Sequence, residues 1–246
     1  MFSFNDLTDK IQDSISDSLD DVSDDIGSSS LIGGFVSILT DLLDDANNFI
    51  SRIEGSIDGD SFSGKDSADL FFGLDGDDFI EGKIGSDTLN GNRGVDRLFG
   101  GEGDDQLRGG KDNDYLQGNQ GLDRLFGDKG NDDVLGGKGD DIIHGGKGDD
   151  TVSGGKGADQ IFGDLGDDVL FGGDGIDKFI FNFGNGSDII KDFETGIDKI
   201  HINSEVKSTI NDVVDSFVDG VIDFGNGNLL EITGLDNLDV NDLLIV

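Results

Sequence analysis

The chain has 246 residues and a formal net charge of −37, because 54 acidic residues stand against 17 basic ones. Such a charge argues against nucleic acid as a partner and predicts that cations balance the protein. The chain has no cysteine, so no disulfide supports the fold, and only 34% of its residues are apolar, so the core must be thin.

The first region, residues 1–54, contains two stretches in which apolar residues recur at helical spacing. They are Leu7, Ile11, Ile15, Leu19, Val22 and Ile26 in the first stretch, and Ile32, Phe35, Leu39, Leu42, Ala46, Phe49 and Ile53 in the second. This spacing predicts two amphipathic helices separated by a break at residues 27–34. The N-terminus lacks the pattern of a cleaved secretory signal, and no apolar stretch reaches the length of a transmembrane helix.

The second region, residues 55–180, repeats every nine residues without an insertion and comprises 14 units. Every unit opens with glycine, six of the 14 have glycine again at the second position and eleven have it at the fourth, and every eighth position is apolar, from Phe62 to Phe179. The sixth position is always aspartate: Asp60, Asp69, Asp78, Asp87, Asp96, Asp105, Asp114, Asp123, Asp132, Asp141, Asp150, Asp159, Asp168 and Asp177.

This pattern predicts a solenoid in which each unit is a glycine-rich turn followed by a short strand at positions seven to nine. Two units then complete one coil, so that the eighth-position side chains stack between two parallel sheets and Asp132 faces Asp150. Carboxylate and backbone carbonyl oxygens that converge without sulfur or histidine suit Ca²⁺ better than Mg²⁺. The alternative is a solenoid whose aspartates only cap turns, but the apolar stripe is too small to order 126 residues by itself.

The nonapeptides "GGKGDDIIH" and "GGKGDDTVS" resemble the glycine-rich repeat of RTX proteins. The resemblance implies a right-handed parallel β-roll that binds several calcium ions, up to about one per repeat. It also implies that carbonyls of the first four positions join the aspartates as ligands, most regularly at Gly136, Gly137, Gly139, Gly145, Gly146, Gly148, Gly154, Gly155 and Gly157. Early units depart from the pattern at Lys65, Leu74 and Lys83, where glycine is missing from the second position, so weaker sites are expected there.

The third region, residues 181–246, alternates apolar and polar residues and predicts a small β cap, with a hairpin that turns at residues 225–227. Its segments "GNGSDIIKDFETGIDKI", "DFGNGNLLEITG" and the acidic-apolar end "DLLIV" resemble the C-terminal region of serralysin-type proteases and other type I secretion substrates, which implies an uncleaved export signal. Asp192 and Asp198 are candidate ligands for one more cation, although solvated turn residues explain them equally well.

No catalytic motif is visible, and the HExxH zinc site of serralysins is absent. His144 and the aromatic residues at ninth positions should point outward, His144 as a solvated residue and the aromatics as cross-strand stacks. The sequence therefore predicts a mainly β, secreted, non-enzymatic calcium-binding protein that a type I transporter exports unfolded and that calcium folds outside. Two alternatives stay open: a membrane-active or bacteriocin-like protein whose effector is the N-terminal helices, and a surface or matrix adhesin.

Overall fold

The computed structural model describes residues 51–246 except 183, 203–216, 226–227, 236–237 and 246. The chain divides into two compact units, residues 1–49 and 50–246, and the described residues belong to the second. The two predicted N-terminal helices lie outside the described residues. The prediction that the second helix extends to Ile53 is wrong, because Ser51–Glu54 form strand β1, which pairs in parallel with β3 (Asp69–Asp75).

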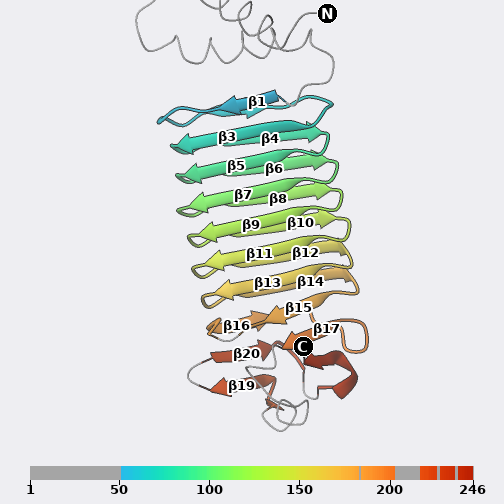
Figure 1. Cartoon of the computed structure of the whole chain (residues 1–246). Helices are drawn as coiled ribbons and strands as arrows, with labels where there is room; N and C mark the ends of the chain where they lie inside the picture. The colour runs from blue at the N-terminus through green and yellow to red at the C-terminus, as the bar shows by residue number, and fades with distance from the viewer. Residues whose placement is uncertain (1–50, 183, 203–216, 226–227, 236–237, 246) are drawn as a thin grey trace, which may run out of the picture. The chain divides into compact units, whose positions relative to one another are not determined.

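The second unit is a stack of parallel strands in two sheets, with successive strands of the array alternating between them (Figure 1). One sheet has the order β1-β3-β5-β7-β9-β11-β13-β15-β17-β21, and the other β18-β19-β20-β16-β14-β12-β10-β8-β6-β4-β2. The remaining strands of the array are β2 (Ser61–Ser63), β4 (Phe79–Ile84), β5 (Thr88–Arg93), β6 (Arg97–Glu102), β7 (Gln106–Lys111), β8 (Tyr115–Gln120), β9 (Arg124–Lys129), β10 (Asp133–Lys138), β11 (Ile142–Lys147), β12 (Thr151–Gly157), β13 (Gln160–Leu165), β14 (Val169–Gly175) and β15 (Lys178–Phe181).

The register confirms that two nonapeptides make one coil. Val134 in β10 lies opposite Val152 in β12, and Ile143 in β11 lies opposite Ile161 in β13, always 18 residues apart. The strands are longer than the three residues predicted. They continue into the first three positions of the next unit because these also pair with the neighbouring coil, as Lys138 does with Lys156.

The eighth-position side chains form the core, as predicted. All fourteen are at most 3% exposed: Phe62, Phe71, Ile80, Leu89, Leu98, Leu107, Leu116, Leu125, Val134, Ile143, Val152, Ile161, Leu170 and Phe179. Side chains alternate across a strand, so positions seven and nine face outward while position eight faces the opposite sheet. One apolar residue from each unit thus separates the two sheets.

Two of the outward ninth-position aromatics, Phe126 and Phe162, stack with His144 along the coil axis, which confirms the cross-strand prediction for these two residues. The ring of His144 lies between those of Phe126 and Phe162, with centroids 5.2 and 4.1 Å apart and planes inclined by 11° and 13°. His144 is therefore not the solvated residue that was predicted. A spacing of 18 puts three rings in one column, and the Nδ1 atom of His144 lies 2.7 Å from Oδ2 of Asp164.

Beyond the array, strands β16 (Ser187–Ile190) and β17 (Lys199–Ile202) extend the two sheets. The predicted hairpin is present: β19 (Val221–Gly225) pairs antiparallel with β20 (Asn228–Ile232), and β18 (Phe217–Val218) pairs with β19. A 3₁₀ turn (Val240–Asp242) leads into β21 (Leu243–Ile245), which pairs in parallel with β17. No helix among the described residues has the length and apolar character needed to cross a membrane.

Candidate metal centre

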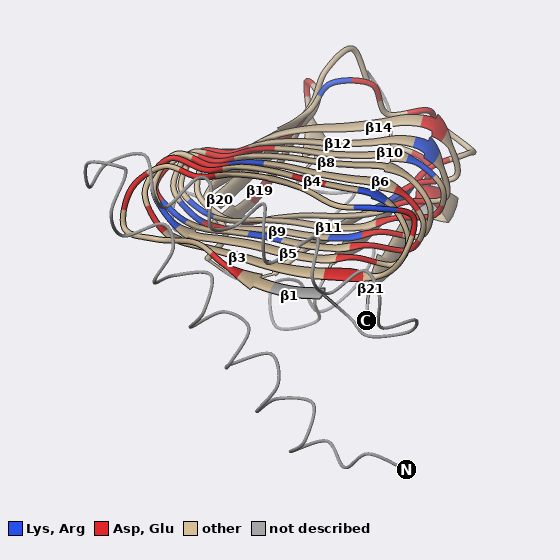
Figure 2. Cartoon of the chain, turned by 90° about the horizontal axis from the view of Figure 1, so that it is seen from above, with Lys and Arg blue, Asp and Glu red and all other residues tan. Residues whose placement is uncertain are grey.

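The structure places the fourteen predicted aspartates in two columns that run along the stack, one through each of the two rows of turns that connect the sheets. Figure 2 shows the red Asp and Glu residues gathered at these turns. Within each column, the backbone N–H of one aspartate donates to Oδ1 of the aspartate one coil further on. Asp132 donates to Asp150 over 2.8 Å, and Asp150 donates to Asp168 over 2.8 Å. The predicted proximity of Asp132 and Asp150 is thus present as a direct hydrogen bond.

The second carboxylate oxygen has no such partner in most of the array. Oδ2 is buried without a hydrogen-bond partner in twelve residues: Asp78, Asp87, Asp96, Asp105, Asp114, Asp123, Asp132, Asp141, Asp150, Asp159, Asp168 and Asp177. Burying an anionic oxygen without a partner is costly, so a regular set of such atoms calls for a ligand. A cation beside each Oδ2 would supply the missing partner.

The turn backbone explains where the glycines are needed. From the third unit onward, the second and fourth positions adopt positive φ, for example 121° at Gly137 and 127° at Gly139. Gly146, Gly148, Gly155 and Gly157 have the same conformation. Glycine adopts positive φ without the strain that a Cβ brings, so these two positions favour glycine.

The unit-opening glycines, including Gly136, Gly145 and Gly154, are required for a different reason. They have ordinary φ, but a Cβ at Gly136 would come closer than 3 Å to Oδ2 of Asp141 and to the carbonyl oxygen of Gly154. The same clash recurs at Gly145 with Asp150 and at Gly154 with Asp159. The absent side chain therefore leaves open the space in front of each unpartnered oxygen.

The column aspartates are buried and lie close to one another, and both conditions raise their pKa. Burial raises the pKa of Asp150 from 3.8 to about 8; the N–H donated by Asp132 lowers it in part, and the charges of Asp132 and Asp168 raise it further. The same causes, with burial first, raise the pKa of Asp141 and Asp114 to about 8. Each value measures how strongly the neutral acid is preferred when no cation is near.

The first two units close their turns without an unpartnered oxygen. The N–H of Ser56 donates to Oδ2 of Asp60 over 2.6 Å, and the N–H of Lys65 donates to Oδ2 of Asp69 over 2.9 Å. The second and fourth positions of these two units lack the positive φ found in later units. Asp60 and Asp69 belong to the columns, but in their turns a backbone N–H group already donates to Oδ2 of the aspartate.

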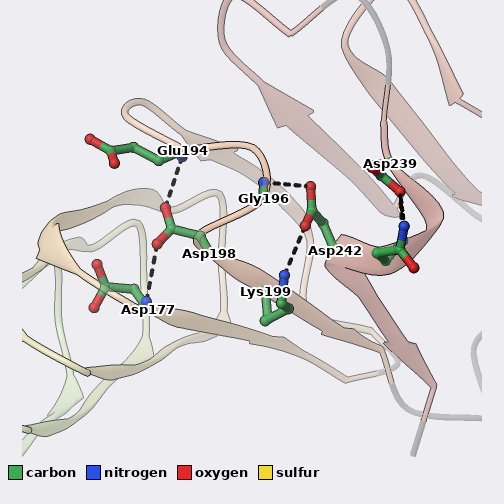
Figure 3. Close-up of polar contacts among 8 residues, drawn as sticks. Asp177, Glu194, Gly196, Asp198, Lys199, Asp239 and Asp242 are labelled. Atoms are coloured by element: carbon green, nitrogen blue, oxygen red, sulfur yellow. Dashed lines mark hydrogen bonds and ion pairs between the residues drawn. The ribbon is translucent and has the colours of Figure 1, made fainter.

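Sequence reasoning missed one member of the columns and left another undecided. The N–H of Asp168 donates to Oδ1 of Asp188 over 3.1 Å. The N–H of Asp177 donates to Oδ1 of Asp198 over 3.0 Å, as Figure 3 shows. Their separations of 20 and 21 residues break the nine-residue period. The motif that could have revealed Asp188 is "GNGSDII" at residues 184–190, which repeats the array's order of glycine, glycine, aspartate and apolar residue.

Asp198 and Asp192 are both satisfied by backbone groups. Oδ2 of Asp198 accepts from the N–H of Glu194 over 2.8 Å, as in the first two units. The carboxylate of Asp192 accepts from the N–H groups of Gly172 and Gly173 over 2.9 and 3.0 Å. These contacts favour the turn-residue interpretation of Asp192 and Asp198 over a further cation site.

The donor set fits calcium. Among the described residues, no group of three or more acidic or histidine side chains is arranged to hold a metal ion, so carboxylates alone do not form a site. The available donors are one unpartnered carboxylate oxygen per turn and the carbonyls of the glycine-rich backbone, which are hard oxygen ligands. Asp78 to Asp177 would hold the ions, whose charge would offset the burial of the carboxylates.

Comparison with known proteins agrees with this geometry. Residues 54–89, 81–116, 108–143, 117–152 and 144–179 match the family model described as the RTX calcium-binding nonapeptide repeat (4 copies). Together these matches cover residues 54–179, about half of the chain. A search among curated proteins finds no match.

Proposed function

Because the chain belongs to the RTX family of calcium-binding nonapeptide-repeat proteins, we propose that it is a secreted module that folds on binding extracellular calcium and acts without catalysis. The observation that carries this proposal is the set of twelve buried, unpartnered carboxylate oxygens. Twelve calcium ions would add 24 positive charges and reduce the formal charge from −37 to −13. In this role calcium is part of the fold.

The energetic argument concerns the calcium-free roll at neutral pH. Burial raises the pKa of even the less perturbed aspartates, such as Asp78 and Asp132, from 3.8 to about 6. Ionising one such group in the folded state costs about 3 kcal/mol, since one pKa unit is worth about 1.4 kcal/mol. A few of them together offset the ~5–15 kcal/mol that stabilises a typical domain. We therefore expect the calcium-free chain to be largely unfolded.

A calcium titration of the chelator-treated full chain, followed by circular dichroism, tests this proposal. The β-sheet signal should appear cooperatively with calcium, because each filled turn orders its neighbour, and magnesium at the same concentration should give little of it. A calcium-free protein at pH 7.5 that already shows the full β-sheet spectrum, unchanged by calcium, would contradict the proposal.

Export follows from the same logic, because a chain that stays unfolded at the low calcium of the cytoplasm suits a transporter that passes unfolded protein. We assign the export signal to the acidic-apolar C-terminal end and the cap to residues 181–246. In a host with a type I transporter, deletion of residues 238–246 should retain the protein inside the cell, whereas deletion of residues 1–50 should leave export intact. Normal export of the first variant would refute this assignment.

A further inference from the structure

The ten-stranded sheet carries a row of basic side chains at the ends of four neighbouring strands. Arg93 in β5 lies opposite Lys111 in β7, Lys111 opposite Lys129 in β9, and Lys129 opposite Lys147 in β11. We call these four exposed residues the basic row. Neighbouring strands are about 4.8 Å apart, so four positive charges lie within about 14 Å. Like charges directly opposite one another destabilise a sheet, so the row needs a compensating anion.

Among the described residues, an acidic side chain pairs with only one member of the basic row, Arg93. Arg93 forms an ion pair with Asp75 at 3.7 Å, and Arg108 forms one with Asp128 at 3.4 Å. Within the described part of the chain, Lys111, Lys129 and Lys147 form no ion pair, although the protein has 54 acidic residues and only 17 basic ones. Figure 2 shows Lys and Arg within the strands, beside the red turns.

The basic row borders a groove in the outer face of the sheet. A hollow of about 400 Å³ is lined by four basic residues, one acidic residue and three others: Arg108, Lys111, Lys129, Lys147, Asp128, Asn90, Asn92 and Gly110. A second hollow of about 310 Å³ continues it past Phe126 and His144. The two hollows share Asp128 and Lys147, and their lining residues come from successive strands. The groove therefore runs along the coil axis with basic side chains repeated at each coil.

We propose that this groove binds an acidic polysaccharide, laid along the coil axis with its carboxylates on the basic row. A linear polymer with regularly spaced anionic groups matches a regular row of cations, and the ammonium groups of lysine bind carboxylates as point charges. Asn90 adds an amide at the groove that suits sugar hydroxyls. The proposal rests on the proposed function, because the row forms only when the roll is folded.

The aromatic column beside the row argues against single-stranded nucleic acid as the ligand. Such binding relies on bases stacked on free aromatic faces. In this column the rings of Phe126, His144 and Phe162 cover one another, and the guanidinium of Arg108 lies over Phe126, 5.2 Å from its centroid. The strong negative charge of the rest of the protein further opposes a polymer as highly charged as nucleic acid.

The repeat itself offers a matched control. Lys138 and Lys156 also occupy third positions and are register neighbours, but they lie in the other sheet. The variant Lys129→Gln/Lys147→Gln and the control Lys138→Gln/Lys156→Gln therefore remove the same charge from equivalent places in the repeat. Circular dichroism in saturating calcium establishes first that both variants fold.

The binding assay uses the full chain in calcium with a fluorescently labelled oligogalacturonate of about ten sugars, short enough to limit gel formation, at low salt. The variant in the basic row should bind at least tenfold more weakly than the unmodified protein, and the control should stay within twofold. Binding should also fall as salt is added, because exposed ion pairs are screened.

Three outcomes would overturn the proposal: equal weakening by both variants, no binding of the oligogalacturonate by the folded protein, or tighter row-dependent binding of single-stranded DNA or anionic vesicles. Because folding is monitored separately, a protein that folds with calcium but does not bind the sugar refutes only the groove assignment. A protein that does not fold with calcium refutes the proposed function instead.

Discussion

Exchanging one column aspartate for asparagine tests whether the unpartnered oxygens bind calcium. Asp150 accepts the N–H of Asp132 at Oδ1, donates its own N–H to Asp168, and leaves Oδ2 buried without a partner. Asp150→Asn keeps the shape and the Oδ1 acceptor but replaces Oδ2 with an amide nitrogen that cannot bind a cation. The matched control is Asp69→Asn, because Oδ2 of Asp69 already accepts the N–H of Lys65.

The expected magnitudes differ clearly. A site filled at a calcium concentration 100 times its Kd contributes about 2.7 kcal/mol to stability, so the loss of the site at Oδ2 of Asp150 should cost about that much. Asp69→Asn removes one backbone hydrogen bond, which is worth about 1 kcal/mol. Asp150→Asn should accordingly raise the calcium midpoint of folding much more than Asp69→Asn.

Urea unfolding at a fixed saturating calcium concentration, followed by circular dichroism, measures both free energies of unfolding, provided that the m-values agree. Equal losses in the two variants, or a larger loss for Asp69→Asn, would show that the unpartnered oxygens are not the calcium ligands.

Three further predictions concern pH, backbone strain and the C-terminal turn. Burial raises the folded-state pKa of column aspartates such as Asp78 and Asp150 from 3.8 to about 6 to 8, so the stability of the calcium-free roll should be greatest below pH 4 and lost as pH rises toward 8. A β-sheet signal that is present at pH 7.5 and disappears on acidification would contradict this. Lys83 is exposed with φ 82°, so Lys83→Gly should stabilise the protein in urea by about 1 kcal/mol, whereas Lys138→Gly, at a position without positive φ, should destabilise it by a similar amount. Lys199 donates to the buried Asp242 over 2.8 Å, as Figure 3 shows, so Lys199→Met should cost about 2 kcal/mol in thermal or urea unfolding, and Lys199→Met/Asp242→Asn should recover most of it.

The repeat pattern alone is enough to predict the architecture of residues 55–180. A strict period of nine, with glycine first, aspartate sixth and an apolar residue eighth, predicts the coil of two units, the core and both aspartate columns. Each of these features depends only on local turn conformation and on side-chain alternation. The fourteen column aspartates, from Asp60 to Asp177, therefore lie where the spacing placed them.

The repeat pattern does not predict the arrangement where the period fails or the contacts between neighbouring coils, because both depend on three-dimensional packing. Asp188 and Asp198 join the columns across insertions because the sheets extend past the array, and the first two turns close on their own N–H groups because their second and fourth positions lack positive φ. The stack around His144 and the basic row require residues 18 apart to come into register. The stack and the row are formed by contacts between coils, which the pattern within one nine-residue unit does not include.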